Sequence, residues 1–247
     1  MKIVDHHSGA ISTLNEWREH FIKRTKKPEH WKKDRSAYSL ADFILNRNGA
    51  ALLESRVSSV LSENVTFEWA TPEYKAKFDR YRNPSQLDLG IFGNIGSGKS
   101  LFVGVEAKVD ETFGKAVGER YRDALKTRQS NPRTKAPERV EQLLSRYFSE
   151  FDPPQDSRFA DIRYQLLTAA AGTVAVRQDL VVLYVLVFKT SSYDPQKGEE
   201  NYSDFKKFVD CAGGKPLAQC GQFGLAHELV IDRKRLVAIH EHVNFGN

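Results

Sequence analysis

Asp88, Glu106 and Lys108 have the residue types and the spacing of a site that could hydrolyse a phosphodiester bond with the help of a metal ion. Facing carboxylates repel each other unless a cation lies between them, and hard divalent ions prefer oxygen ligands. Magnesium binds one or two protein carboxylates and keeps water and phosphate oxygens as its other ligands. The three residues therefore predict a Mg²⁺ (or Mn²⁺) site in which Asp88 and Glu106 bind the metal and Lys108 orients the attacking water or neutralises the phosphate.

A β-hairpin would bring these residues together. Apolar and polar residues alternate on both sides of the Gly/Ser-rich residues 93–100, and a period of two predicts two strands joined by a turn. With the turn centred on Ser97, Asp88 lies directly opposite Glu106, with Cβ atoms about 4.5–5.5 Å apart. Lys108 projects from the same face. A register slip of one residue would separate the two carboxylates.

The residues of the expected turn also match a different motif. Gly93–Ser100 fits G-x-x-x-x-G-K-[ST], in which backbone amides hold phosphates, Lys99 would reach the terminal phosphates and Ser100 would bind magnesium. A phosphate-binding loop of this kind must open a helix. The residues that follow are rich in β-branched and aromatic types at a period of two, which favours a strand. A nucleotide-binding enzyme that uses Gly93–Ser100 is therefore the alternative to the hairpin.

The hairpin and its acidic residues resemble the PD-(D/E)XK nuclease superfamily, the restriction-endonuclease-like fold of many restriction and repair enzymes. That core has a helix, three strands, a second helix and a further strand, with an Asp on the second strand and E-x-K on the third. Asp88 and Glu106-Ala-Lys108 match those positions, although Leu87 replaces the proline and the nearest one is Pro84. The superfamily includes members that bind without cutting, so a nuclease-like nucleic-acid-binding module without cleavage is a further alternative.

A series of short motifs is also similar to an uncharacterised bacterial family with this core. Their order along the chain, from about residue 35 to residue 210, carries this resemblance. The motifs are Arg35-Ser-Ala37, Ser85-Gln-Leu-Asp88, Val105-Glu-Ala-Lys-Val-Asp-Glu-Thr-Phe-Gly114, Arg163-Tyr-Gln-Leu-Leu167 and Asp204-Phe205. The resemblance implies a DNA endonuclease more readily than an exonuclease, and a role in restriction or defence follows from it alone.

The resemblance adds further candidate site residues. Nucleases of this fold often recruit an acid from the first helix, and Glu54 is the candidate here. Gln165 would reach the site from the helix that follows the strands, and Gln86 shares the strand face of Asp88. His240 and His242 flank an acidic residue near the C-terminus and form a second candidate metal site, with an exposed strand as the alternative.

The positive charge of the chain is concentrated in two segments. The 247 residues include 37 Lys and Arg against 32 Asp and Glu, a net charge of +5. Residues 18–35 hold eight basic and three acidic residues, and residues 115–146 hold nine and four, so each segment carries +5. Such clustering is typical of proteins that bind a polyanion, although solvated helix faces also produce it. The expected DNA contacts are Lys26, Lys27, Lys32, Lys33, Arg35, Arg120 and Arg163.

The chain as a whole predicts an α/β (α+β) fold with a mixed central sheet flanked by helices. We expect a basic helical extension over residues 1–34, the nuclease-like core over 35–210 and a strand or hairpin extension over 211–247. The longest apolar run, at 180–188, is too short to cross a membrane. The N-terminus lacks a secretory signal pattern and the chain has two cysteines, so a reducing cytoplasm is expected. The sequence leaves open whether the protein forms a homodimer and whether it has a partner protein.

Individual elements follow from the same periodicities. Helices are predicted at 11–24, 39–61 (with a break near Asn48), 115–128, 137–150, 158–177 and 202–209. Strands are predicted at 65–69, 86–91, 101–110, 180–188 and 229–239.

Overall fold

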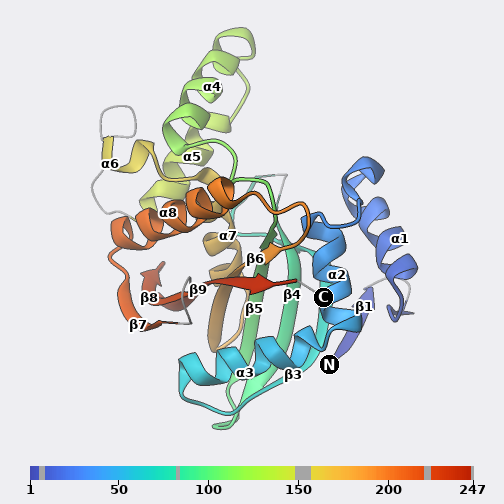
Figure 1. Cartoon of the computed structure of the whole chain (residues 1–247). Coiled ribbons are helices and arrows are strands. Elements are labelled where there is room, and N and C mark those ends of the chain that lie inside the picture. The colour runs from blue at the N-terminus through green and yellow to red at the C-terminus, as the bar shows by residue number, and fades with distance from the viewer. Residues whose placement is uncertain (6–8, 82–83, 148–156, 220–223, 246–247) are drawn as a thin grey trace.

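The computed structural model describes residues 1–5, 9–81, 84–147, 157–219 and 224–245 (Figure 1). The helices are α1 (Leu14–Thr25), the 3-10 helix η1 (Pro28–His30), α2 (Ser36–Asn46), α3 (Gly49–Leu61), α4 (Val117–Ser130), α5 (Ala136–Ser145), α6 (Ser157–Ala160), α7 (Tyr164–Ala175) and α8 (Pro195–Cys211). The strands are β1 (Lys2–Asp5), β2 (Gly9–Ala10), β3 (Val65–Ala76), β4 (Ser85–Ile95), β5 (Ser100–Lys108), β6 (Leu180–Lys189), β7 (Lys215–Gln219), β8 (Leu225–Ile231) and β9 (Lys234–Asn244).

The nine strands form one mixed sheet in the order β2-β1-β3-β4-β5-β6-β9-β8-β7. Strands β3, β4 and β5 form an antiparallel meander, and β5, β6 and β9 run parallel to one another. The ends of β3, β5, β6 and β9 and the start of β4 therefore lie at the same edge of the sheet. The structure confirms the predicted α/β class with a mixed sheet flanked by helices.

Two apolar cores lie on the two faces of this sheet. One core packs α1, α2 and α3 against the sheet, and its helix residues include Trp17, Leu40 and Leu53. The other core packs helices α4 to α8, and its residues include Tyr121, Leu144, Phe159, Leu166 and Phe205. Both cores include residues of β5 and β6, which are buried on both faces as expected for central strands.

The Gly/Ser-rich segment is a hairpin turn between β4 and β5. The ladder from Leu89–Val105 to Asn94–Ser100 has the predicted register. At the turn, the Ile95 N–H donates to Lys99 O at 2.9 Å, and Gly98 adopts φ +80°. A phosphate-binding loop would need a helix after Ser100, but that residue begins a strand, so the structure contradicts the geometry required by the nucleotide-binding alternative.

Gly93 provides a test of this hairpin. A Cβ atom added there would lie 2.1 Å from the backbone oxygen of Thr66 on β3, so Gly93→Ala should force the two strands apart. We expect the melting temperature to fall by roughly 2–10 °C, because such overpacking costs about 1–3 kcal/mol. Gly96→Ala is the matched control, because its Cβ would meet Asn64 at an ordinary 3.5 Å. Equal melting temperatures for the two variants would contradict this packing.

The structure corrects several predicted boundaries. The predicted strand at 65–69 continues to Ala76, and the helix predicted at 158–177 is two helices, α6 and α7. The segment expected to be a helical extension also contributes β1, which pairs with β3. The predicted hairpin around Asp232 and Arg233 is confirmed, since both residues adopt positive φ between β8 and β9. Among the described residues, no helix has the length and apolar character needed to cross a membrane.

Candidate active site

Asp88 and Glu106 meet at the sheet edge where β4 begins and β5 ends. The β4–β5 ladder reaches Leu89–Val105, and one residue further on Asp88 Oδ2 accepts a hydrogen bond from the Ala107 N–H at 2.7 Å. The Glu106 side chain is buried, with 1% of its surface exposed. The predicted hairpin thus brings the two carboxylates together.

Lys108 lies within the same cluster. Its ammonium nitrogen is 3.8 Å from Glu106 Oε2 and 5.3 Å from the ring centre of Phe113. Only 5% of Lys108 is exposed. A buried lysine is costly unless negative charge lies beside it, and the two carboxylates supply that charge. The three residues predicted to act together therefore do lie together.

Gln165 reaches this cluster from the first turn of α7. Its side-chain Nε2 donates a hydrogen bond to Glu106 Oε2 at 2.8 Å. The helix packs against β4, β5 and β6, which fixes the distance between its first turn and the end of β5. The position predicted for Gln165 is confirmed.

Glu73 on β3 is a third acidic residue of the site, and the sequence did not predict it. Pro72 pairs with Leu89 and Tyr74 pairs with Leu87, which leaves Glu73 at the position opposite Asp88. Its side chain is buried and accepts a hydrogen bond from the Gln86 amide. Three neighbouring strands therefore each contribute one carboxylate. Gln86 is a hydrogen-bond partner of Glu73, the carboxylate on β3.

Pro72 is the reason that the sequence pattern concealed Glu73. A proline within a strand usually marks an edge or the absence of a strand, so the stretch after Trp69 did not suggest a strand. In the structure, β1 pairs with β3 only as far as Ala70, and among the described residues no strand pairs with β3 beyond it on that side, where proline is tolerated. Glu73 adopts φ +53°, a left-handed conformation rare for a residue with a side chain. Such strain concentrates at functional sites.

The positive charge near the three carboxylates is too small to balance their negative charge. Burial and the nearby charge of Asp88 together raise the pKa of Glu106 to about 8, against the opposing effects of Lys108 and Gln165. Burial also raises the pKa of Asp88, against Lys108 and the Ala107 N–H. The pKa of Glu73 lies well above its ordinary value because of burial and the charge of Asp88. One lysine therefore does not compensate the cluster, and a cation would relieve it.

This donor set fits magnesium. Among the described residues, no group of three or more His, Cys, Asp and Glu side chains is close enough to hold a metal by itself. Magnesium needs only one or two carboxylates when water and substrate phosphate complete its shell. Asp88 and Glu106 are the residues that would hold it, and their raised pKa values are what an acidic site shows when no cation balances it.

A cavity of about 420 Å³ opens beside these carboxylates. Sheet residues and Gln165 form one wall, and α1 with the segment that follows it forms the other. The lining residues are Phe21, Arg24, Thr25, Lys27, His30, Ser36, Ala37, Glu73, Gln86, Asp88 and Gln165. Ligand-binding cavities typically measure about 300–1,000 Å³, and this volume lies within that range.

Helix α1 is held against the site by His20, which is buried. The His20 Nε2–H donates to the Pro72 carbonyl at 3.0 Å, and Nδ1 lies 3.2 Å from Asp5 Oδ2. His20 thus links α1 to β1 and to Pro72, the residue before Glu73. The segment predicted as an extension, residues 1–34, is therefore part of the site.

Two predicted residues lie elsewhere. Glu54 Oε2 accepts a hydrogen bond from the Phe67 N–H at 2.6 Å, and Phe67 pairs with Gly93, several residues along β3 from Glu73. Glu54 thus joins α3 to the sheet, and Glu73 is the additional acid at the site instead. Arg163 donates to Asp204 at 2.7 Å and to the Gly114 carbonyl at 2.8 Å, so it joins α7 to neighbouring segments.

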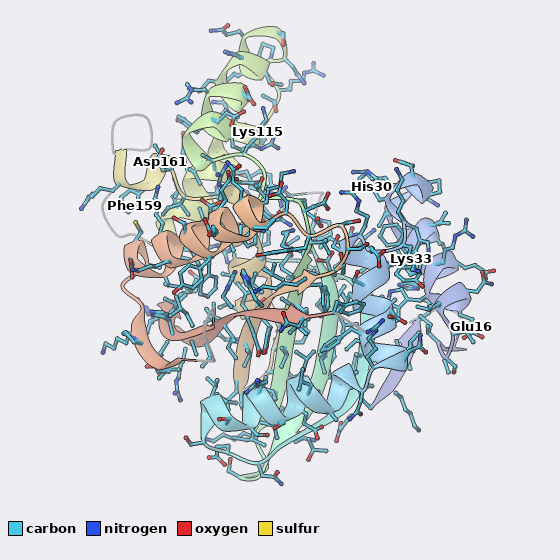
Figure 2. All side chains as sticks on the ribbon, viewed as in Figure 1. Glu16, His30, Lys33, Lys115, Phe159 and Asp161 are labelled. Carbon is cyan, nitrogen blue, oxygen red and sulfur yellow. The ribbon has the colours of Figure 1, made fainter. Side chains whose placement is uncertain are left out.

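The residues predicted to contact DNA divide into two regions. Lys26, Lys27, Lys32 and Lys33 are exposed on the segment between α1 and α2, whereas Arg35 forms an ion pair with Asp110. Arg120 lies on α4, with its guanidinium 5.5 Å from the Tyr164 ring centre. Figure 1 shows α1 and the α4–α5 pair on opposite sides of the sheet edge, and Figure 2 shows Lys115 and His30 in these two regions.

The candidate histidine site takes a different form from the one predicted. His240 is fully buried, and its ring lies 5.2 Å from Phe205 and 5.1 Å from His242 between centres. Glu241 instead interacts with the Tyr184 hydroxyl and with Arg56. Alternation along β9 thus separates the glutamate from the two histidines, and the expected exposed strand is largely buried.

Comparison with known proteins yields one match. A family model described as "Domain of unknown function (DUF6946)" matches residues 10–238, which is most of the chain. No curated protein and no solved structure matches the chain. The matched range includes the four residues Glu73, Asp88, Glu106 and Lys108.

Proposed function

The chain belongs to the DUF6946 family, and on that premise we propose that it is a metal-dependent nuclease that hydrolyses phosphodiester bonds in DNA. The observation that carries the proposal is the row of Glu73, Asp88 and Glu106 with Lys108 beside it, in which Asp88 is partly buried and the others are buried. Raised pKa values in a cavity are typical of functional sites. Cations on the opposite wall make the cavity suitable for a phosphate backbone.

The order of the elements also supports this proposal. Helix α3, strands β3, β4 and β5, helix α7 and strand β6 follow one another in the order of the PD-(D/E)XK core, apart from α4, α5 and α6 inserted before α7. Asp88 lies on the second of these strands and the E-x-K residues lie on the third. Leu87 in place of the proline remains the departure from that pattern.

Each residue of the site has a distinct role in the proposed reaction. Asp88 and Glu106 would hold a magnesium ion, which supplies stabilisation of the negative charge that develops on the phosphate. Lys108, as an ammonium group, donates hydrogen bonds to the attacking water or to a phosphate oxygen. Gln165 orients the Glu106 carboxylate through its hydrogen bond. Burial and the charge of Asp88 raise the pKa of Glu73 well above its ordinary value, which favours the protonated form over a third negative charge in the site.

Incubation with supercoiled plasmid tests the proposal. With Mg²⁺ or Mn²⁺ the protein is expected to nick or linearise the plasmid, and EDTA is expected to stop the reaction, because it removes the ion that would stabilise the charge developing on the phosphate. Gel electrophoresis over time measures the conversion. Retention of plasmid without cutting under every metal condition would instead indicate a DNA-binding module. ATP hydrolysis that requires Lys99 would contradict the proposal.

A further inference from the structure

We propose that the cavity beside the carboxylates admits a single strand of DNA, and that Arg24 on α1 binds a backbone phosphate there. This inference rests on the proposed function, because it names the form of DNA that the same site takes. It depends on three features: the hydrogen bonding of Arg24, the course of the cavity and the size of the space between its two walls.

Arg24 lacks an anionic partner. Its Nη2 lies 3.4 Å from the Glu73 carbonyl oxygen, and its Nε–H is buried with no hydrogen-bond acceptor. Within the described parts of the chain, no carboxylate forms an ion pair with it. A buried donor without an acceptor costs free energy, and a guanidinium matches two phosphate oxygens with its planar pair of donors. A phosphate in the cavity would satisfy that requirement.

The neighbouring carboxylate does not compete for Arg24. Glu73 already accepts a hydrogen bond from the Gln86 amide, and the hydrogen bond of Arg24 goes to the backbone carbonyl of Glu73 and not to its carboxylate. Arg24 can therefore bind an added anion, although an acidic cluster lies beside it. The arrangement places a cation on one wall and the proposed metal ligands on the other, so a phosphate between them would touch both.

A second cavity continues the first. It measures about 340 Å³ and shares His30 and Ser36 with the first cavity. Lys27 lines the first cavity and Lys32 lines the second, whose wall also contains Glu29, Asp110 and Glu111. Figure 2 shows His30 and Lys33 together on this side of the molecule. A strand whose phosphate occupies the first cavity could thus continue along a second cavity of mixed charge, where Lys32 is the candidate contact for its next phosphate.

The dimensions favour one strand over a duplex. Each cavity has the volume of a site for a small ligand, about 300–1,000 Å³. A duplex is stiff over about 150 base pairs and carries its phosphates on the outside of a rod. It would need local bending or unpairing to place one phosphate between α1 and the sheet. A single strand can bend at each nucleotide, so it can place one phosphate in a cavity of this size without bending or unpairing a duplex.

Binding measured without cleavage tests this inference. Fluorescence anisotropy with a labelled 12-nucleotide strand and with a hairpin duplex of the same sequence would be recorded in EDTA at pH 6.5 and low salt. We expect the wild type to bind the single strand more tightly. Arg24→Ala should weaken that binding by about 10–100-fold, as expected for the loss of hydrogen bonds to a charged group. Arg24→Lys should restore part of it.

Lys23→Ala is the matched control. It removes the same charge from the same helix, but Lys23 is exposed and does not line the cavity, so we expect a change of at most about twofold. Equal affinity of wild type and Arg24→Ala, or tighter binding of the duplex, would overturn the inference even if the plasmid is cut with Mg²⁺. Binding that depends on Arg24 without any cutting would uphold it and would refute the nuclease activity. Melting temperatures of all variants would show that they are folded.

Discussion

Replacing Asp88 with asparagine is expected to lower the rate of plasmid cleavage by about 10²–10⁴-fold, since a catalytic metal ion contributes several kcal/mol of charge stabilisation. The folded protein should be at least as stable as the wild type. Asparagine can still accept the hydrogen bond from the Ala107 N–H, and the substitution removes one charge from a cluster in which all three carboxylates have raised pKa values. Cleavage rate and thermal unfolding would be measured on the same sample.

Two matched variants make this result specific. Lys99→Ala alters an exposed turn residue, and Glu54→Gln alters an acid that hydrogen-bonds the Phe67 N–H away from the site. Both should cut at close to the wild-type rate. An Asp88→Asn protein that cuts normally would contradict the assignment of this site. Loss of cutting in Lys99→Ala alone would instead favour a role for Gly93–Ser100.

The second large effect concerns stability, pH and magnesium. Glu106 has a pKa of about 8 in the folded chain against 4.5 as its ordinary value, so between these pH values the folded state holds a proton that the unfolded state has released. The stabilisation that this bound proton gives the folded state is therefore complete below pH 4.5 and is lost as the pH rises through about 8. Relative to Glu106→Gln, the melting temperature of the metal-free wild type should fall on the order of 10 °C from pH 5 to pH 8.5.

Magnesium should reverse this loss. A ligand at about 100 times its Kd stabilises the folded state by about 2.7 kcal/mol, which corresponds to roughly 5–10 °C for a chain of this size. The increase should be larger at pH 8.5 than at pH 6, because the metal competes with protons for the carboxylates. Glu106→Gln should lack the part of the pH dependence that Glu106 contributes and most of the magnesium response. The same magnesium response in Glu106→Gln and wild type would place the ion elsewhere.

The centre of the site was predictable because its signals are local. The alternation of residues around the Gly/Ser-rich turn set the register of β4 and β5, and the register placed Asp88 beside Glu106. Lys108 followed from the two-residue period of a strand. Gln165 came from a resemblance and not from periodicity, because its distance from Glu106 depends on how α7 packs on the sheet.

The rest of the site depends on contacts between distant parts of the chain. Glu73 occupies a strand that continues past a proline, and its conformation requires support that no local pattern shows. Glu54 was the additional acid that the sequence suggested for the site, yet α3 directs its side chain to the backbone N–H of Phe67. The charge of residues 18–35 predicted a basic segment, but only the fold places Arg24 against the carboxylates.

The distribution of the site along the chain affects the protein as it is synthesised. Arg24 and the strands that carry the three carboxylates are synthesised before Gln165. A nascent chain or a truncated product that ends before α7 therefore contains the acidic residues without the glutamine that orients Glu106 and without the helix that covers this face of β4 and β5. The completed cavity, and the activity proposed for it, therefore requires a chain that has been synthesised at least through α7.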